Sequence, residues 1–91
     1  MAIVTLRYWA AAKDAAGVAE DKVEAETLAE AIAAGLAAAD DRPGEHAGRL
    51  RQVMARSSFL VDGQPAGVRP HDSVVLSADS VVEVLPPFAG G

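Results

Sequence analysis

The chain has 91 residues and a formal net charge of -5, with 13 Asp plus Glu against 8 Lys plus Arg and no cysteine. This length fits one domain, and the acidic balance disfavours nucleic-acid binding, which depends on clustered lysine and arginine. No apolar run approaches the ~20 residues of a membrane-spanning helix, no secretory signal opens the sequence, and disulfides and thiolate sites are excluded, so we expect a cytoplasmic protein.

The opening residues predict two strands around a short helix. Residues 2–9 alternate in polarity, which predicts a strand. Its core-facing side chains are Ala2, Val4, Leu6 and Tyr8. Trp9 falls on the opposite face. Residues 10–16 predict an alanine-rich helix closed by Gly17, because glycine readily adopts the left-handed conformation, and residues 19–25 predict a weaker strand that pairs back on the first.

Two helices are expected next. Thr27 and Glu30 have the spacing of a capping box, so the first helix begins there. Its apolar positions recur every three or four residues and are Leu28, Ala31, Ile32, Gly35, Leu36 and Ala39. It ends near Asp41, before a Pro-Gly break. Residues 45–56 predict the second helix. Its shared apolar face consists of Ala47, Leu50, Val53 and Met54.

A hairpin follows the helices. Residues 58–61 predict a short strand, Asp62-Gly63 predicts a tight turn because both residues tolerate positive φ, and residues 64–68 are expected to pair back briefly. Residues 69–79 show no clear period. We expect the apolar side chains of Val74, Val75 and Leu76 to be buried.

The last predicted strand, residues 81–85, is apolar apart from Glu83, which is typical of a strand in the middle of a sheet. The order of elements therefore predicts an α+β domain over residues 1–85, with a mixed sheet and helices packed on one face.

A stiff tail is expected after Leu85. It comprises Pro86, Pro87, Phe88, Ala89, Gly90 and Gly91. The two prolines cannot donate to a strand ladder and hold the backbone extended, so the tail should project from the sheet. Phe88 offers a partner one large apolar side chain, and the residues after it are little more than backbone. Such a tip can enter a narrow channel and present its carboxylate to chemistry there, whereas an inert, frayed terminus is the plain alternative.

Both ends of the sequence carry a family pattern. Residues 4–10 read VTLRYWA, residues 82–91 read VEVLPPFAGG, and Lys13-Asp14, Gly17 and Asp62-Gly63-Gln64 lie between them. This pattern resembles the small subunit of molybdopterin synthase, a ubiquitin-like β-grasp sulfur carrier. One departure is Asp79, which replaces the glycine that family members commonly carry before the last strand. Aspartate tolerates the left-handed region, so we expect the turn to be retained.

The resemblance implies a function for the tail. An adenylyltransferase similar to ubiquitin-activating enzymes would use ATP and Mg²⁺ to adenylate Gly91, and a sulfur donor protein would convert the adenylate into a thiocarboxylate. Gly91 would then deliver sulfur to the cyclic pyranopterin precursor inside the large subunit, which supplies the catalytic residues. This chain would bind no cofactor itself and would act as the sulfur-donating subunit.

Three alternatives remain open. A carrier for thiazole or cysteine biosynthesis would share the fold and the Gly-Gly ending. A ubiquitin-like modifier would join Gly91 to lysines of other proteins. A plain binding module would not use its tail at all.

The remaining residues give weaker signals. His46 and His71 lack metal-ligand spacing, so we expect surface histidines and no metal site, and we expect Asp40-Asp41 to be solvated. Tyr8 and Phe59 are expected in the core. Trp9 and Leu85, on a sheet face without helices, are candidates for an apolar patch that docks a partner together with the tail.

Overall fold

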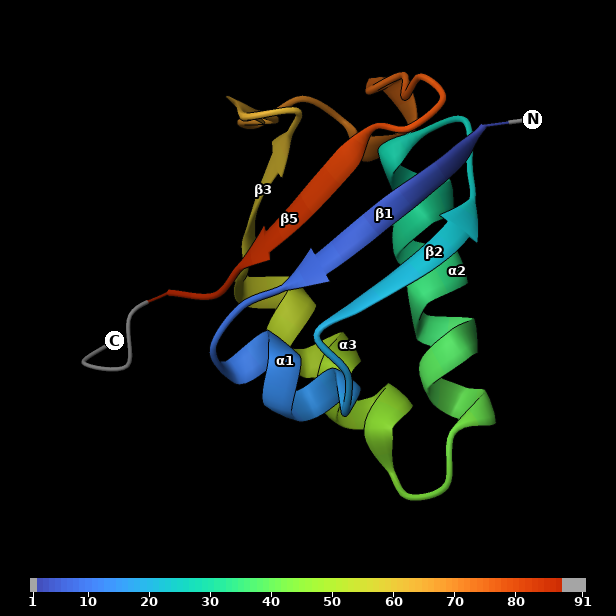
Figure 1. Ribbon diagram of the computed structural model, residues 1–91. Coiled ribbons are helices and arrows are strands. Elements are labelled where there is room, and N and C mark those ends of the chain that lie inside the picture. Colours follow the sequence, from blue (N-terminus) through green and yellow to red (C-terminus); the bar gives the residue numbers. More distant parts are fainter. Residues whose placement is uncertain (1, 88–91) are drawn as a thin grey trace.

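The computed structural model describes residues 2–87, and in this range it contains five strands, three α-helices and one 3₁₀ helix (Figure 1). In chain order they are β1 (Ile3–Tyr8), α1 (Ala11–Ala16), β2 (Glu20–Glu24), α2 (Leu28–Asp41), α3 (His46–Arg56), β3 (Ser58–Val61), β4 (Gln64–Pro65), η1 (His71–Ser73) and β5 (Val81–Leu85). These bounds confirm the predicted strands and helices, except that the return strand β4 is shorter than expected.

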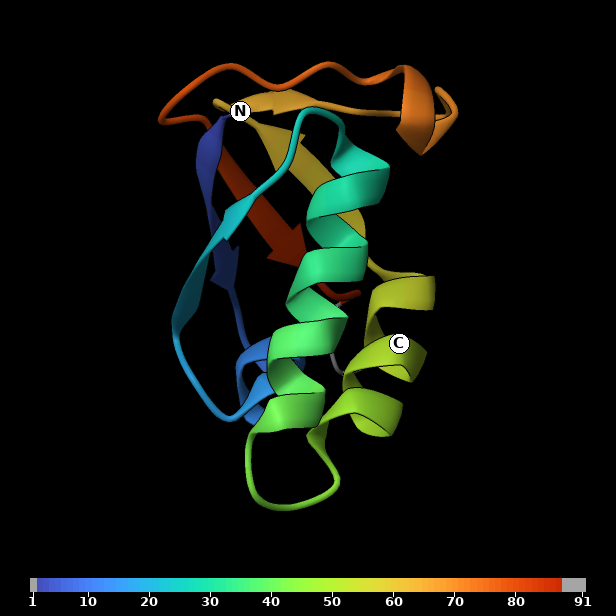
Figure 2. The same ribbon diagram turned by 90° about the vertical axis from the view of Figure 1, so that its right-hand side faces the viewer.

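The strands form one mixed sheet in the order β2-β1-β5-β3-β4. β1 and β5 lie parallel at its centre, while β2 pairs antiparallel with β1, and β3 pairs antiparallel with β5. The long helix α2 crosses one face of this sheet, and α1 and α3 pack on the same side (Figures 1 and 2). The structure therefore confirms an α+β domain with a mixed sheet and helices on one face.

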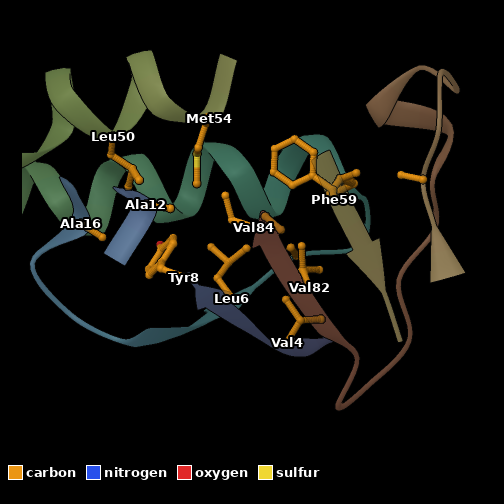
Figure 3. Packing of buried hydrophobic residues seen from close by; sticks show 14 of the residues in the cluster. Val4, Leu6, Tyr8, Ala12, Ala16, Leu50, Met54, Phe59, Val82 and Val84 are labelled. Atoms are coloured by element: carbon orange, nitrogen blue, oxygen red, sulfur yellow. The ribbon is translucent and has the colours of Figure 1, made fainter. Parts of the chain in front are cut away.

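The core lies between the central strands and the helices (Figure 3). Its largest fully buried side chains are Tyr8, Leu6, Leu28, Leu50, Val4, Val82 and Val84. Alternate residues of β1 and β5 point toward the helices, as the sequence pattern of both strands predicted. Phe59 adds its ring from β3, which confirms both aromatic residues expected in the core.

The predicted caps and turns are present. Gly17 ends α1 with a φ of 82°, and the Thr27 side chain accepts a hydrogen bond from the backbone N–H of Glu30 at 3.2 Å. The Glu30 carboxylate accepts in return from the backbone N–H of Glu26 at 2.8 Å, one residue before the usual partner. Asp79 has a φ of 66°, so the aspartate retains the left-handed turn as expected.

The segment between β4 and β5 corrects one expectation. Val74 and Leu76 are buried, but Val75 is 76% exposed, so the prediction that all three would be buried was wrong for Val75. The reason is local geometry: Val75 forms an isolated antiparallel bridge with Thr27, and in an extended segment successive side chains point to opposite sides.

Candidate functional site at the root of the tail

The tail begins from the centre of the sheet. β5 ends at Leu85, as predicted, and its last residues are held from both sides: Val84 pairs with Tyr8 of β1, and Leu85 pairs with Ser58 of β3. Pro86 is half-buried and Pro87 is exposed, and neither belongs to a strand. A partner that takes up the following residues would therefore meet a fixed starting point.

Four residues of the predicted site lie outside the described residues. They are Phe88, Ala89, Gly90 and Gly91. Their roles as a slim tip and a reactive terminus remain predictions from the sequence.

Trp9 is an exposed aromatic residue that hydrogen bonds hold beside this strand end. Its backbone N–H donates to the Val84 carbonyl at 3.3 Å, and its own carbonyl accepts from the Ala12 N–H at 2.9 Å. The indole Nε1–H donates to the Glu83 carboxylate at 3.1 Å. Both backbone and ring are thus fixed, although 46% of the residue surface is exposed, so little conformational entropy remains to be lost on binding.

A strained turn follows Trp9. Ala10 has φ 49° and ψ -123°, which matches the first central position of a type II′ turn, closed by the bond between Ala12 N–H and Trp9 carbonyl. Glycine normally occupies this position because a Cβ atom is strained there. The backbone strain lies directly beside the root of the tail.

The face of the sheet opposite the helices carries both predicted docking residues. Tyr8, the last residue of β1, pairs with Val84 of β5. Trp9 and Leu85 come directly after these two buried residues, on the opposite face of the sheet. The half-buried side chain of Leu60 comes from β3 on the same face. The structure thus places Trp9 and Leu85 on the same face, and Leu60 extends the apolar surface. Their role in docking a partner stays a prediction.

Charged residues interrupt this surface, and no sequence pattern indicated a role for them. Glu83 holds the indole of Trp9, its register partner is Arg7, and Arg7 forms an ion pair with Glu20 at 3.6 Å. The alternation of β5 already placed Glu83 on this face, but its hydrogen bond joins residues 74 positions apart and has no local signal. The surface combines apolar anchors with a polar rim, as partner-binding surfaces commonly do.

On the helix side, a partly buried polar network links four elements. The Tyr8 hydroxyl donates to Asp21 at 2.9 Å, and Arg42 donates to the same carboxylate at 3.1 Å and to the Ala16 carbonyl at 2.8 Å. Burial, reinforced by the charge and hydrogen bond of Asp21, raises the pKa of Tyr8. This network fixes β1, β2 and the ends of α1 and α2.

Both histidines correct the sequence prediction. They were expected on the surface, but each is half-buried and has a partner. Nδ1 of His46 lies 3.0 Å from the Ala15 carbonyl, and the ring of His71 packs edge-on against Phe59 with centroids 5.2 Å apart. These contacts assign both side chains to packing.

Within residues 2–87, no group of three or more His, Cys, Asp or Glu residues is arranged to hold a metal ion. Among the same residues, no helix combines the length and apolar character needed to cross a membrane.

Comparisons with known proteins identify the fold. Neither a protein-family model nor a curated protein sequence matches the chain. Among solved structures, the chain is similar to SAMP1 from Haloferax volcanii, with a TM-score of 0.75, 18% identity, and coverage of 98% of this chain and 99% of that one. The small archaeal modifier protein 1 from Methanosarcina acetivorans gives a TM-score of 0.73 and 21% identity, covering 100% and 98% of the two chains.

A third similar structure is a chain from the complex of subunits 1 and 2 of the molybdopterin-converting factor of Helicobacter pylori. Its TM-score is 0.65 at 18% identity, with 98% of this chain and 99% of that chain covered. At such low identity these likenesses concern the fold. They confirm the ubiquitin-like β-grasp architecture of residues 2–87.

Proposed function

We propose that this ubiquitin-like β-grasp protein is a sulfur carrier and the small subunit of a molybdopterin synthase. In this proposal the Gly91 carboxyl group is the reagent, and the folded body holds the tail out toward other proteins. The observation that carries the proposal is the end of β5: a central strand, paired on both sides, ends at Leu85 and continues in sequence as Pro-Pro-Phe-Ala-Gly-Gly.

The chemistry follows from the nature of a carboxylate. A carboxylate is a poor electrophile because it is anionic, so a partner adenylyltransferase would use ATP and Mg²⁺ to form the acyl adenylate of Gly91, releasing pyrophosphate. Sulfide supplied by a donor protein would attack the acyl carbon of the adenylate and displace AMP, which leaves the thiocarboxylate. That sulfur is ionised near neutral pH and is a soft nucleophile, by the reasoning that makes a thiolate reactive. This ATP-dependent recharging is consistent with a cytoplasmic location.

The open sheet face supports the partner role. Tail insertion into a large subunit would bring that subunit against the surface around the tail root, where Trp9, Leu85 and Leu60 supply apolar area. Trp is among the residues that dominate binding energy at interfaces. The likeness to a chain of a two-subunit converting factor supports the same arrangement, in which the large subunit takes up Pro86, Pro87 and the residues beyond them.

Intact mass spectrometry tests the proposal. The chain is co-expressed with an activating enzyme and a sulfur donor, and we expect the mass increment for replacement of one carboxylate oxygen by sulfur. Two variants serve as matched controls: deletion of Gly91 and addition of one residue after it. Both should retain the folded circular dichroism spectrum and lose the increment. Sulfur transfer by the extended variant would contradict the proposal.

To identify the pathway, the thiocarboxylated chain is mixed with a molybdopterin synthase large subunit and the cyclic pyranopterin precursor. Formation of the dithiolene supports the molybdopterin role. A charged chain that forms no dithiolene but supports thiazole or cysteine synthesis would assign it to one of those carriers.

A ubiquitin-like modifier is the second candidate, because two of the similar structures are small archaeal modifier proteins. In that role the adenylated Gly91 would be attacked by a lysine amine of another protein. The same experiment separates the two functions, since a modifier would appear in conjugates of higher mass that resist thiol reduction. Conjugates without thiocarboxylate-dependent pterin chemistry would favour the modifier.

A further inference from the structure

Glu83 is a charged residue among apolar side chains at the root of the tail. It lies in the middle of β5, two residues before Leu85 and on the same open face, and its register partners are Arg7 of β1 and Leu60 of β3. A partner that covers Trp9, Leu85 and Leu60 must also displace water from this carboxylate, which costs free energy. Such a position calls for a contact that uses the carboxylate.

That contact is with the indole ring of Trp9. The Glu83 carboxylate accepts a hydrogen bond from the indole Nε1–H at 3.1 Å. Arg7, which is in register with Glu83, forms its ion pair with Glu20 on the other side, at 3.6 Å. The indole has a single N–H group, so the hydrogen bond to Glu83 selects one orientation of the ring.

The backbone is fixed at both ends of this hydrogen bond. Glu83 belongs to a central strand that is paired on both sides. The Trp9 N–H donates to the Val84 carbonyl at 3.3 Å, and the Trp9 carbonyl accepts from the Ala12 N–H at 2.9 Å. When the Glu83 side chain is shortened, the backbone therefore stays in place and only the indole ring gains freedom.

The order of the ring matters for binding because Trp9 is exposed. A free, exposed tryptophan samples several rotamers, and a partner that covers it must restrict them to one. A ring that already has one orientation loses less conformational entropy, so a preorganised surface binds more tightly than a mobile one with the same contacts. Glu83 can thus strengthen docking without touching the partner.

We propose that Glu83 is a positioning residue for partner docking: it orients the Trp9 indole in the free chain and acts on the partner only through that ring. The proposal rests on the proposed function, in which the partner is the large subunit that takes up the tail. A direct ion pair between Glu83 and a basic group of the partner would be a different role. It depends on charge and not on the indole N–H, so experiment separates the two.

The first measurement uses the free, ¹⁵N-labelled full chain. Trp9 is the only tryptophan, so the indole N–H signal reports on this ring alone. We expect a heteronuclear NOE of the indole N–H close to that of the β1 amides, and a clearly lower value in Glu83→Ala. Glu83→Gln keeps an acceptor oxygen and should restore the wild-type value. Glu24→Ala is the matched control, because it makes the same charge change at the far end of the same face, opposite Ile3.

The second measurement is calorimetric titration with a molybdopterin synthase large subunit. Glu83→Ala should weaken binding about three- to tenfold, the effect of restricting one large side chain, whereas Glu83→Gln and Glu24→Ala should change it less than about twofold. The loss in Glu83→Ala should be the same at low and high salt, since the indole is uncharged.

A double-mutant cycle with Trp9→Phe tests whether Glu83 acts through the ring. Phenylalanine keeps an aromatic ring but has no N–H donor, so Glu83→Ala should weaken binding no further in the Trp9→Phe background. A loss that persists in that background, or that disappears at high salt, would assign Glu83 to direct contact with the partner and overturn the positioning role.

The outcomes also separate this proposal from the proposed function. A wild-type chain that does not bind the large subunit would contradict the proposed function, and the docking role of Glu83 with it. Binding that Glu83→Ala leaves unchanged, an equal loss in Glu83→Gln, or an indole as ordered in Glu83→Ala as in the wild type would overturn the positioning role alone. Thermal unfolding of each variant checks that the β-grasp domain remains folded.

Discussion

Gly35 lies where α2 comes closest to the sheet. A Cβ atom at this position would lie 2.6 Å from Leu6 Cδ1 and 2.8 Å from the Tyr8 hydroxyl, and both side chains are fully enclosed in the core. Overpacking of this kind costs about 1–3 kcal/mol, while alanine regains up to about 1 kcal/mol of helix propensity. We expect Gly35→Ala to lower the free energy of unfolding by about 1–2 kcal/mol in denaturant titrations.

Gly48 provides the matched control for that substitution. It is also helical, but a Cβ atom there meets nothing within 4 Å, so only the propensity gain remains. Gly48→Ala should raise the free energy of unfolding by about 0.5–1 kcal/mol. If both alanine variants changed stability in the same direction, the close approach at Gly35 would not be the cause.

Tyr8 predicts how stability depends on alkaline pH. Burial and the contact with Asp21 raise the pKa of Tyr8, so the folded state favours the neutral phenol. The stabilisation that the neutral phenol gives the folded state is fully present below about pH 10, the pKa of tyrosine in the unfolded chain. It is lost as pH rises above that value, by up to about 1.4 kcal/mol per pH unit. Denaturant titrations between about pH 9 and pH 11 should show this slope, and Tyr8→Phe should remove it.

An independent measurement checks the same prediction. Tyr8 is the only tyrosine of the chain, so the ultraviolet absorbance of tyrosinate reports on it alone. In the folded protein this absorbance should appear only well above about pH 10, the ordinary pKa of tyrosine. In denaturant it should appear near that pH. Ionisation at the same pH in both states would contradict the buried contact with Asp21.

The turn that connects β1 to α1 stores strain at Ala10. Ala10 has a φ of 49°, at which glycine has no steric cost. Relief of this strain stabilises the folded state by about 1–2 kcal/mol, which exceeds the free-energy cost of the more flexible unfolded chain. We therefore expect Ala10→Gly to raise the melting temperature. Ala11→Gly, one residue later at the start of α1, should lower it by removing helix propensity.

The strands and helices were predictable because their signals are local. Alternation in β1 and β5, the spacing of Thr27 and Glu30, and the Asp62-Gly63 pair each occupy a few neighbouring residues. Asp62 and Gly63 adopt φ values of 50° and 83°, the positive values that this dipeptide predicts. Each of these patterns can be recognised without knowledge of any tertiary contact.

The features that could not be predicted from the sequence depend on contacts between residues far apart in the chain. The His46 ring lies within hydrogen-bond distance of the Ala15 carbonyl, 31 positions away in the sequence. The Glu83 carboxylate accepts a hydrogen bond from Trp9, 74 positions away. The strained turn at Ala10 has no signal either, because alanine is not typical of that conformation. For the candidate site, the pairing of Trp9 with Leu85 was predictable from strand faces, whereas the groups that immobilise the indole were not.

The open face of the sheet has one end beside the tail root and one end far from it. We expect partner binding to depend on residues at the tail root and not on those at the far end. Trp9 and Ile3 are equally exposed, at 46% and 45%, and both belong to the open face, but Trp9 lies beside the tail root while Ile3 begins β1 at the far end. We expect Trp9→Ala to weaken binding to a molybdopterin synthase large subunit at least about tenfold in calorimetric titrations.

Ile3→Ala is the control for the tryptophan substitution and should change the affinity less than about threefold, since isolated peripheral contacts contribute little. Unfolding curves of both variants establish that the sheet is intact. Equal effects of the two substitutions would place the interface across the whole face and contradict a site confined to the tail root.

The parallel pairing of β1 with β5 also has a mechanical consequence. A pull on the tail acts along the axis of β5, which is bonded to β1 on one side and to β3 on the other. Such a load shears both ladders at once, so their hydrogen bonds must break together and cannot be peeled apart singly. An enzyme can therefore bind the chain end, pull on it and release it in repeated rounds of charging without unfolding the β-grasp domain.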